Sequence, residues 1–231
     1  MSRRDLLLYL KDFGWSDVDI SPELRRDAGP AQAPSRAALK VAQGADPQAA
    51  GDLAEMARRL ADCRRCRLCQ GRSRVVFGVG NPRAKVVFVG EGPGAEEDRL
   101  GEPFVGSAGQ LLNAMLRAID LRREDVYIAN VIKCRPPKNR DPEPGEAATC
   151  LPFLRRQLEL IEPDVIVVLG RVAARYLLGF QGAINTYRGR WTTWEGRDVL
   201  PTFHPAYLLR NPGAKPTSWV DFKLLRRRLR I

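Results

Sequence analysis

Four apolar runs, each followed by polar or glycine-rich residues, recur along the chain from residue 85 onward. Runs rich in Val, Ile and Leu are typical of strands that are buried on both faces of a parallel sheet. The pattern therefore predicts four strands, and they cover residues 85–90, 125–133, 164–170 and 197–205.

Segments with apolar residues at helical spacing separate these runs. Residues 107–120, for example, place Leu111, Leu112 and Met115 on one face. Strands that alternate with helices favour a mostly parallel sheet with helices on both faces. The other predicted helices cover residues 52–63, 144–163, 172–179 and 218–230. In the second of these, Pro152 should interrupt the first turns.

The N-terminal part of the chain has a different composition. Residues 1–22 could form a short amphipathic helix, and residues 22–50 are rich in Ala and Pro without a sustained period. Such a segment is typical of a linker. We therefore predict a mobile N-terminal helix and linker over residues 1–50 and one globular domain over residues 51–231.

Composition excludes several classes of protein. No apolar run approaches the ~20 residues that cross a bilayer, and no small-residue cleavage site follows residues 5–10. We therefore expect a cytoplasmic protein, in which thiols stay reduced. The odd count of five cysteines also argues against a closed disulfide framework.

The charge balance points to a polyanionic partner. Lys and Arg number 38 against 27 Asp and Glu, which gives a net charge of +11. Such an excess favours association with phosphate backbones, although a merely basic protein would show it too. His204 is the only histidine, which rules out His-rich zinc sites and relays that need two imidazoles.

Functional residues of an open parallel sheet gather beyond the carboxyl ends of its strands. At the first end, GEGPGAEED is not a dinucleotide fingerprint, because Pro93 removes an N–H group and the third glycine is misplaced. Its acidic residues could bind Mg²⁺ in a nuclease, but the other strand ends carry no carboxylates. The alternative is that residues 96–98 cap a turn or a helix.

Three further positions carry side chains suited to a planar base. Phe104 lies in a glycine-flanked loop and is either a buried plug or a stacking platform. Asn130 ends a predicted strand and is either a turn residue or a reader of a nucleobase edge, since its amide both accepts and donates. His204 is either an ordinary strand-end histidine or part of the same site.

The segment after His204 is the candidate for DNA contact. Tyr207, Leu208, Leu209 and Arg210 lie in a loop bracketed by prolines. They resemble an apolar wedge with a guanidinium that contacts phosphate, and such wedges insert between base steps or fill the space left by a flipped base.

The cysteines form one close cluster, CRRCRLCQGR at residues 63–72, and a distant pair, Cys134 and Cys150. A zinc knuckle would need a second C-x-x-C or histidines, and a redox C-x-x-C is expected inside the sheet. Thiolates from three separate segments favour an iron–sulfur cluster. Zinc and unligated thiols remain the alternatives.

With these residues assembled, the chain from about residue 61 to residue 221 resembles the family 4 uracil-DNA glycosylases, the iron–sulfur branch of the uracil-DNA glycosylase superfamily. The resemblance implies a three-layer α/β/α fold with a central, mostly parallel four-stranded sheet. It also implies a monomer that flips uracil out of single- or double-stranded DNA and hydrolyses its N-glycosidic bond. The segments that carry it are GEGPGAEED, GEPFVGSAGQLL, NVIKCRPPKNRDPEP, VIVVLG and TFHPAYLLRNP.

The resemblance further implies a structural 4Fe–4S cluster that pins the basic loop at residues 135–140 against the sheet. Its ligands would be Cys63, Cys66, Cys134 and Cys150. Cys69 would then be the fifth, unligated thiol.

The same resemblance assigns roles to the residues at the strand ends. Phe104 would stack on the flipped uracil, Asn130 would pair with its edge, and His204 would donate a hydrogen bond to its O2. The remaining assignments are Glu91 with the backbone of Gly92 for positioning water, Glu97 for substrate binding in the same segment, and Leu208, Leu209 and Arg210 for DNA contact.

The sequence also bears on two other functions. A cross-linking branch of the superfamily carries an extra histidine in a basic insert, and KCRPPKNR has none, so that chemistry is not expected. A non-catalytic iron–sulfur DNA-binding protein of replication or repair would show the same salt-dependent DNA affinity but no base release.

Overall fold

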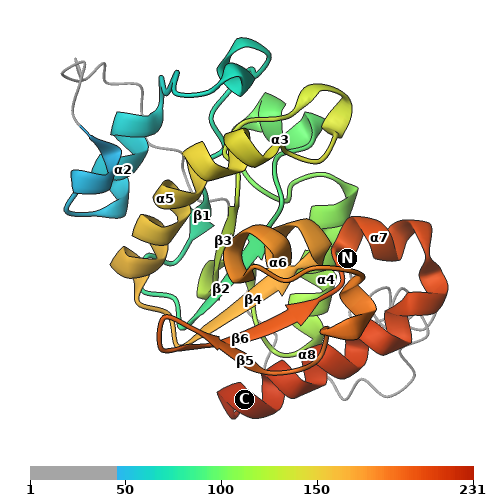
Figure 1. The fold of residues 1–231 in the computed structure, drawn as a ribbon. Coiled ribbons are helices and arrows are strands. Elements are labelled where there is room, and N and C mark those ends of the chain that lie inside the picture. Colours follow the sequence, from blue (N-terminus) through green and yellow to red (C-terminus); the bar gives the residue numbers. More distant parts are fainter. Residues whose placement is uncertain (1–45) are drawn as a thin grey trace.

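A computed structural model describes residues 46–231 of the chain (Figure 1). The helix predicted over residues 1–22, and the linker up to residue 45, lie outside the described residues. Within the described part, no helix combines the length and the apolar character needed to cross a membrane.

The centre of the domain is one six-stranded sheet with the order β1-β3-β2-β4-β6-β5. The four strands expected from the sequence are β2, β3, β4 and β6, and they pair in parallel. The predicted count of four is too low, because β1 and β5 add antiparallel edges of two and three residues. Strands this short carry no readable apolar period. The bounds are β1 Val79–Gly80, β2 Val86–Gly90, β3 Tyr127–Asn130, β4 Val165–Leu169, β5 Thr192–Trp194 and β6 Arg197–Thr202.

Helices cover both faces of the sheet, which confirms the predicted α/β/α layers. On one face, α4 and α8 pack on Phe88, Val167 and Leu200. On the other, α2, α5 and α6 pack on Val87 and Ile166. The α-helices are α2 Leu53–Leu60, α3 Ala95–Leu100, α4 Ser107–Ala118, α5 Pro144–Ile161, α6 Gly170–Leu178, α7 Pro205–Arg210 and α8 Lys215–Leu229. Short 3₁₀ helices lie at Pro47–Ala49, Arg67–Gln70, Arg123–Asp125, Pro137–Asn139, Ile184–Thr186 and Pro212–Ala214.

Helix α5 corrects one expectation about proline. Pro152 lies inside the helix, which nevertheless runs without a break from Pro144 to Ile161. A proline in a helix interior removes one hydrogen bond and crowds the preceding turn. Here Phe153 and Leu154, directly after it, are buried in the core, and this tertiary packing holds the turn in place.

Two short helices occur where the sequence suggested a turn or a loop. Helix α3 begins after Gly94, whose N–H donates to the Glu97 carboxylate, so the acidic residues do cap a helix. Helix α7 occupies the segment that was expected to be a proline-bracketed loop. Pro205 is its first residue, a position at which proline is favourable because its missing N–H would have no helical partner.

Residues 46–50, which the sequence places in the predicted linker, pack against the domain. Ala50 is fully buried in the core beneath α2 and α5. Its carbonyl oxygen accepts a hydrogen bond of 2.8 Å from Nη2 of Arg156 on α5. Residues 46–50 therefore belong to the domain.

Candidate active site

A cavity of about 330 Å³ opens at the carboxyl ends of β2, β3 and β6. A volume of this size is typical of small-molecule sites. Seven of the residues proposed from sequence line it together, although they are spread over 120 positions of the chain. They are Glu91, Gly92, Glu97, Phe104, Asn130, His204 and Arg210.

Asn130 presents an unsatisfied acceptor in this cavity. It is the last residue of β3, only 1% exposed, and its Oδ1 has no hydrogen-bond partner among the described residues. A buried polar atom without a partner costs about 1–3 kcal/mol. A ligand that donates a hydrogen bond to this oxygen would recover that energy.

Gly90 makes the space in which Asn130 and Phe104 approach each other. The parallel register pairs Gly90 on β2 with Asn130 on β3. A Cβ atom at Gly90 would lie 2.4 Å from Oδ1 of Asn130 and 2.7 Å from the ring of Phe104. Because both neighbours are held by the core, no other residue fits at this position.

The Phe104 ring forms a nearly buried wall whose backbone is held in an unusual conformation. Its φ of 53° lies in the left-handed region, which non-glycine residues rarely adopt. Its ring centroid lies 5.4 Å from that of His204. Arg123, which sequence reasoning missed, donates to the carbonyl oxygens of Phe104, at 3.1 Å, and of Pro103.

Glu97 lines the cavity, but its carboxylate is occupied by the protein. One oxygen accepts the N–H groups of Val105 and Gly106, both at 2.9 Å, and the other accepts that of Gly94 at 3.2 Å. Glu97 and Arg123 thus hold the Phe104 loop from both of its sides. The geometry makes Glu97 a residue that positions Phe104.

His204 is held as a neutral imidazole of defined tautomer. Its Nδ1 accepts a hydrogen bond of 3.1 Å from the N–H of Ala206 at the start of α7. Burial, followed by the positive charge of Arg210, lowers the pKa of His204 to about 4, whereas the charge of Glu97 opposes the shift. At neutral pH the proton therefore lies on Nε2, which is left as a hydrogen-bond donor.

Glu91 is the titratable carboxyl of the cavity. Burial, followed by the negative charge of Asp141, raises the pKa of Glu91 to about 7, against the opposing charge of Arg171. Asp141 lines the same cavity and pairs with Arg171, with Oδ2 and Nη2 2.7 Å apart. Glu91 can therefore accept a proton near neutral pH, as a general base must.

Helix α7 corrects the predicted DNA-contacting wedge. Leu208 is fully buried in the core against the α4 side of the sheet, so it has no surface with which to touch DNA. Helical rather than loop geometry explains this, because successive residues of a helix point in different directions. Tyr207 and Leu209 are the exposed apolar residues, at 36% and 37%.

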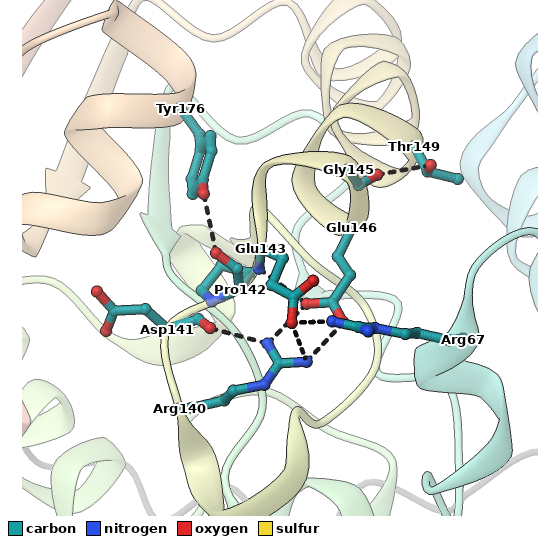
Figure 2. Close-up of polar contacts among 9 residues, drawn as sticks. All are labelled: Arg67, Arg140, Asp141, Pro142, Glu143, Gly145, Glu146, Thr149 and Tyr176. Carbon is teal, nitrogen blue, oxygen red and sulfur yellow. Dashed lines mark hydrogen bonds and ion pairs between the residues drawn. The ribbon is translucent and has the colours of Figure 1, made fainter.

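The loop between β3 and α5 forms one wall of the cavity, and a buried carboxylate anchors it (Figure 2). Glu146, on the first turn of α5, accepts two hydrogen bonds from Arg140, at 2.7 and 2.8 Å. It also accepts one of 2.9 Å from Nε of Arg67, which belongs to the cysteine-rich segment. The loop and the cysteine-rich segment are therefore joined through one side chain.

A second, more open cleft continues from the cavity along this loop. It shares Pro136 and Arg140 with the first cavity and has a volume of about 670 Å³. Its basic side chains are Arg67, Arg135, Lys138 and Arg140. Since Arg67 and Arg140 pair with Glu146, the charge that suits this surface to a polyanion comes from Arg135 and Lys138.

Four of the five cysteines line a separate small cavity. Cys63, Cys66, Cys134 and Cys150 face it, and Cys69 does not. In the described residues no group of His, Cys, Asp or Glu side chains could hold one metal ion.

Positive groups adjoin these thiols. Arg72 donates to Sγ of Cys134 at 3.1 Å, and the backbone N–H of Lys133 donates to Sγ of Cys150 at 3.3 Å. Burial raises the pKa of Cys150 to about 12, and the charge of Lys133 opposes that shift. Donors directed at sulfur are typical of thiolates that ligate a metal centre.

Sequence comparison assigns most of the described domain, including the residues that line the first cavity, to a known group. The model of the Uracil DNA glycosylase superfamily matches residues 77–224. The chain is 54% identical to a type-4 uracil-DNA glycosylase of Thermotoga maritima, over 66% of this chain and 81% of the relative. It is 47% identical to the type-4 uracil-DNA glycosylase of Archaeoglobus fulgidus, over 74% of this chain and 90% of the relative. A type-5 uracil-DNA glycosylase of Pyrobaculum aerophilum is 32% identical to the chain, over 67% of this chain and 83% of the relative.

The tautomer of His204 can be tested directly, because it is the only histidine in the chain. We expect nitrogen–proton correlation spectra of tag-free protein to show one neutral imidazole with its proton on Nε2 from pH 5.5 to 8. Titration near the ordinary pKa of about 6.5, or a proton on Nδ1, would contradict the assignment.

Proposed function

Since the chain belongs to the uracil DNA glycosylase superfamily, and within it to the type-4 enzymes, we propose that it hydrolyses the N-glycosidic bond of uracil in DNA. The observation that carries the proposal is the unpartnered Oδ1 of Asn130, buried beside Phe104 and His204 in one cavity. We also propose that the chain acts as a monomer and in the cytoplasm.

Base recognition follows from the chemistry of the amide. Oδ1 of Asn130 accepts the N3–H of uracil while the amide nitrogen donates to O4. Cytosine has no N3–H and presents an amino group instead of O4, so both contacts would be mismatched. Mismatched buried groups discriminate strongly between ligands. Phe104 stacks on the face of the base, which must leave the helix to reach this depth.

The bond-breaking step is served by charges that the cavity already holds. As the C1′–N1 bond breaks, its electron pair leaves with uracil, and the sugar becomes oxocarbenium-like. Nε2–H of His204 donates to O2 of the departing anion, and as a preorganised neutral donor it stabilises charge that develops in the transition state. The Glu91 carboxylate stabilises the cationic sugar through space.

Water completes the hydrolysis. Glu91 and the backbone of Gly92 position a water molecule, whose oxygen forms the new bond to C1′. Its proton passes to Glu91 and then, through solvent, to the uracil anion, which leaves free uracil and an abasic site. Gly92 has no room for a side chain, since a Cβ would lie 2.7 Å from Cγ1 of Ile132.

The surface around the cavity supplies the DNA contacts. Tyr207 and Leu209 are exposed on α7, and we propose that they occupy the space left by the flipped nucleotide. Arg210 at the cavity and the basic cleft beside it bind phosphates.

We propose that Cys63, Cys66, Cys134 and Cys150 hold a 4Fe–4S cluster. The support is a cavity lined by these four thiols, with Arg72 and Lys133 beside them. Such a cluster can carry an electron, but glycosidic hydrolysis transfers none. The four cysteines therefore serve to join the segment around residues 63–72, the loop after β3 and helix α5.

The proposal is tested by incubating the protein, in EDTA, with an oligonucleotide that contains one uracil. Alkali then cleaves the abasic product. We expect cleavage with uracil and none with cytosine, whereas a non-catalytic DNA-binding protein would leave the strand intact. Asn130→Ala should lower uracil release about 100-fold because two buried hydrogen bonds to the base are lost.

The matched control is Asn81→Ala, which removes the same amide at the opposite end of the sheet. It should leave uracil release unchanged. Binding of both variants to uracil-free DNA, measured by fluorescence anisotropy, should equal that of the unaltered protein. An equal loss of DNA binding and of uracil release in Asn130→Ala would remove Asn130 from base recognition.

The raised pKa of Glu91 predicts a pH dependence. The carboxylate is the active form, so kcat should rise tenfold per pH unit below about pH 7 and level off above it. Asp141→Asn removes a negative charge that raises this pKa, so the rising limb should move to lower pH.

Asp198→Asn, on the β6 side of the sheet, serves as the charge-matched control and should leave the profile in place. Glu91→Gln should lower kcat and abolish the limb. A rising limb that persists in Glu91→Gln would show that another group titrates.

The ligand assignment predicts which cysteine is dispensable. Cys69 lies outside the thiol cavity, so Cys69→Ser should keep the brown chromophore and the iron content of anaerobically purified protein. Cys66→Ser should lose both. The opposite pattern in visible absorbance and iron analysis would reassign the ligands.

A further inference from the structure

Lys133 is a fully buried lysine between the two cavities. It is 2% exposed, three residues after Asn130 and directly before Cys134. In the described part of the chain it forms no ion pair with a carboxylate. Because an isolated buried ammonium is very costly, the protein must compensate this charge in another way.

On one side, Lys133 faces the thiols. It lines the cavity of the four cysteines together with Arg72. The groups that would interact with its ammonium once ionised are the thiols of Cys150 and Cys134. Four thiolates around a 4Fe–4S core carry a net negative charge, so the loaded site supplies the missing counter-charge.

On the other side, Lys133 holds the backbone of the base-reading residue. Its Nζ donates to the carbonyl oxygen of Asn130 at 2.9 Å. The N–H of the same peptide unit, that of Val131, donates to the carbonyl oxygen of Gly90 at 2.9 Å. Both polar atoms of this peptide are therefore fixed, which fixes the direction in which the Asn130 side chain leaves it.

Gln157 on α5 completes the arrangement. Its Oε1 accepts from Nζ of Lys133 at 2.5 Å, and its Nε2 donates to the carbonyl oxygen of Phe77 at 2.9 Å and to the hydroxyl of Tyr127 at 3.3 Å. The amide is thus oriented with its oxygen towards the ammonium. This network contains no negative side chain, so it places the lysine without neutralising it.

We propose that Lys133 is a positioning residue that couples the cysteine site to base recognition, as counter-ion of the thiolate-bound cluster and as anchor of the Asn130 peptide. The proposal rests on the proposed function and on the proposed cluster. A change in the charge of the cysteine site would then act on the residue that reads uracil through one buried side chain.

The test uses Lys133→Met, which removes both the charge and the donor, and Lys133→Gln, which removes the charge and keeps a donor. Lys85→Met makes the same charge change at an exposed position directly before β2, at the opposite end of the sheet. Three quantities are measured on anaerobically purified protein: the reduction potential of the cluster, the inhibition of the reaction by free uracil, and the affinity for uracil-free DNA.

We expect both Lys133 variants to lower the reduction potential, because a nearby positive charge stabilises the reduced cluster. Lys133→Met should weaken inhibition by uracil about tenfold, as expected for loss of a charge-assisted hydrogen bond that orients Asn130. Lys133→Gln should weaken it less. Affinity for uracil-free DNA should not change, and Lys85→Met should match the unaltered protein throughout.

The potential and the uracil inhibition separate the possible outcomes. A folded Lys133→Met protein with unaltered potential and unaltered uracil inhibition would overturn the proposal. If Lys133→Met does not fold, Lys133→Gln decides by its potential alone. Uracil release by the unaltered protein is measured first, so that failure of the proposed function is recognised independently of any result for Lys133.

Discussion

The candidate site depends on one steric constraint, the absence of a side chain at Gly90. Parallel pairing of β2 with β3 places this glycine beside Asn130, and the ring of Phe104 closes over the same point. The planar ring and the amide can flank one shared space only because nothing projects between them. Glu97 and Arg123 then hold the loop that carries Phe104 in this position through hydrogen bonds to its backbone. The rest of the cavity is assembled around a gap that the sheet register creates.

Burial gives the cavity its chemical character. Removal from water keeps His204 neutral, raises the proton affinity of Glu91 and leaves the Asn130 oxygen without a partner. In water each of these groups would be ordinary. In the cavity they become a donor, a base and an acceptor of fixed direction, without the need to reorganise solvent during the reaction.

Much of this arrangement could be predicted from sequence, and the remainder has a physical explanation. The strands and the convergence of Phe104, Asn130 and His204 follow from apolar runs and from the geometry of parallel sheets. The role of Glu97 could not be read, because its partners are backbone N–H groups that any sequence possesses. Arg123 lies nineteen residues from the carbonyl that it holds. The prediction for Leu208 is wrong because the six residues that begin with Pro205 form about one and a half helical turns rather than a loop.

The carboxylate of Glu146 has a consequence for the synthesis of the protein. Its partner Arg67 lies 79 positions earlier, beside the first two cysteines of the thiol cavity, and the last of those cysteines follows Glu146 on the same helix. A chain that emerges from the ribosome therefore exposes Cys63 and Cys66 well before the residues that enclose them exist. Completion of the site is a late event, and during that interval the early thiols are open to oxidation or to a delivery protein. The order of translation, as well as the final geometry, thus bears on how the cysteine site is filled.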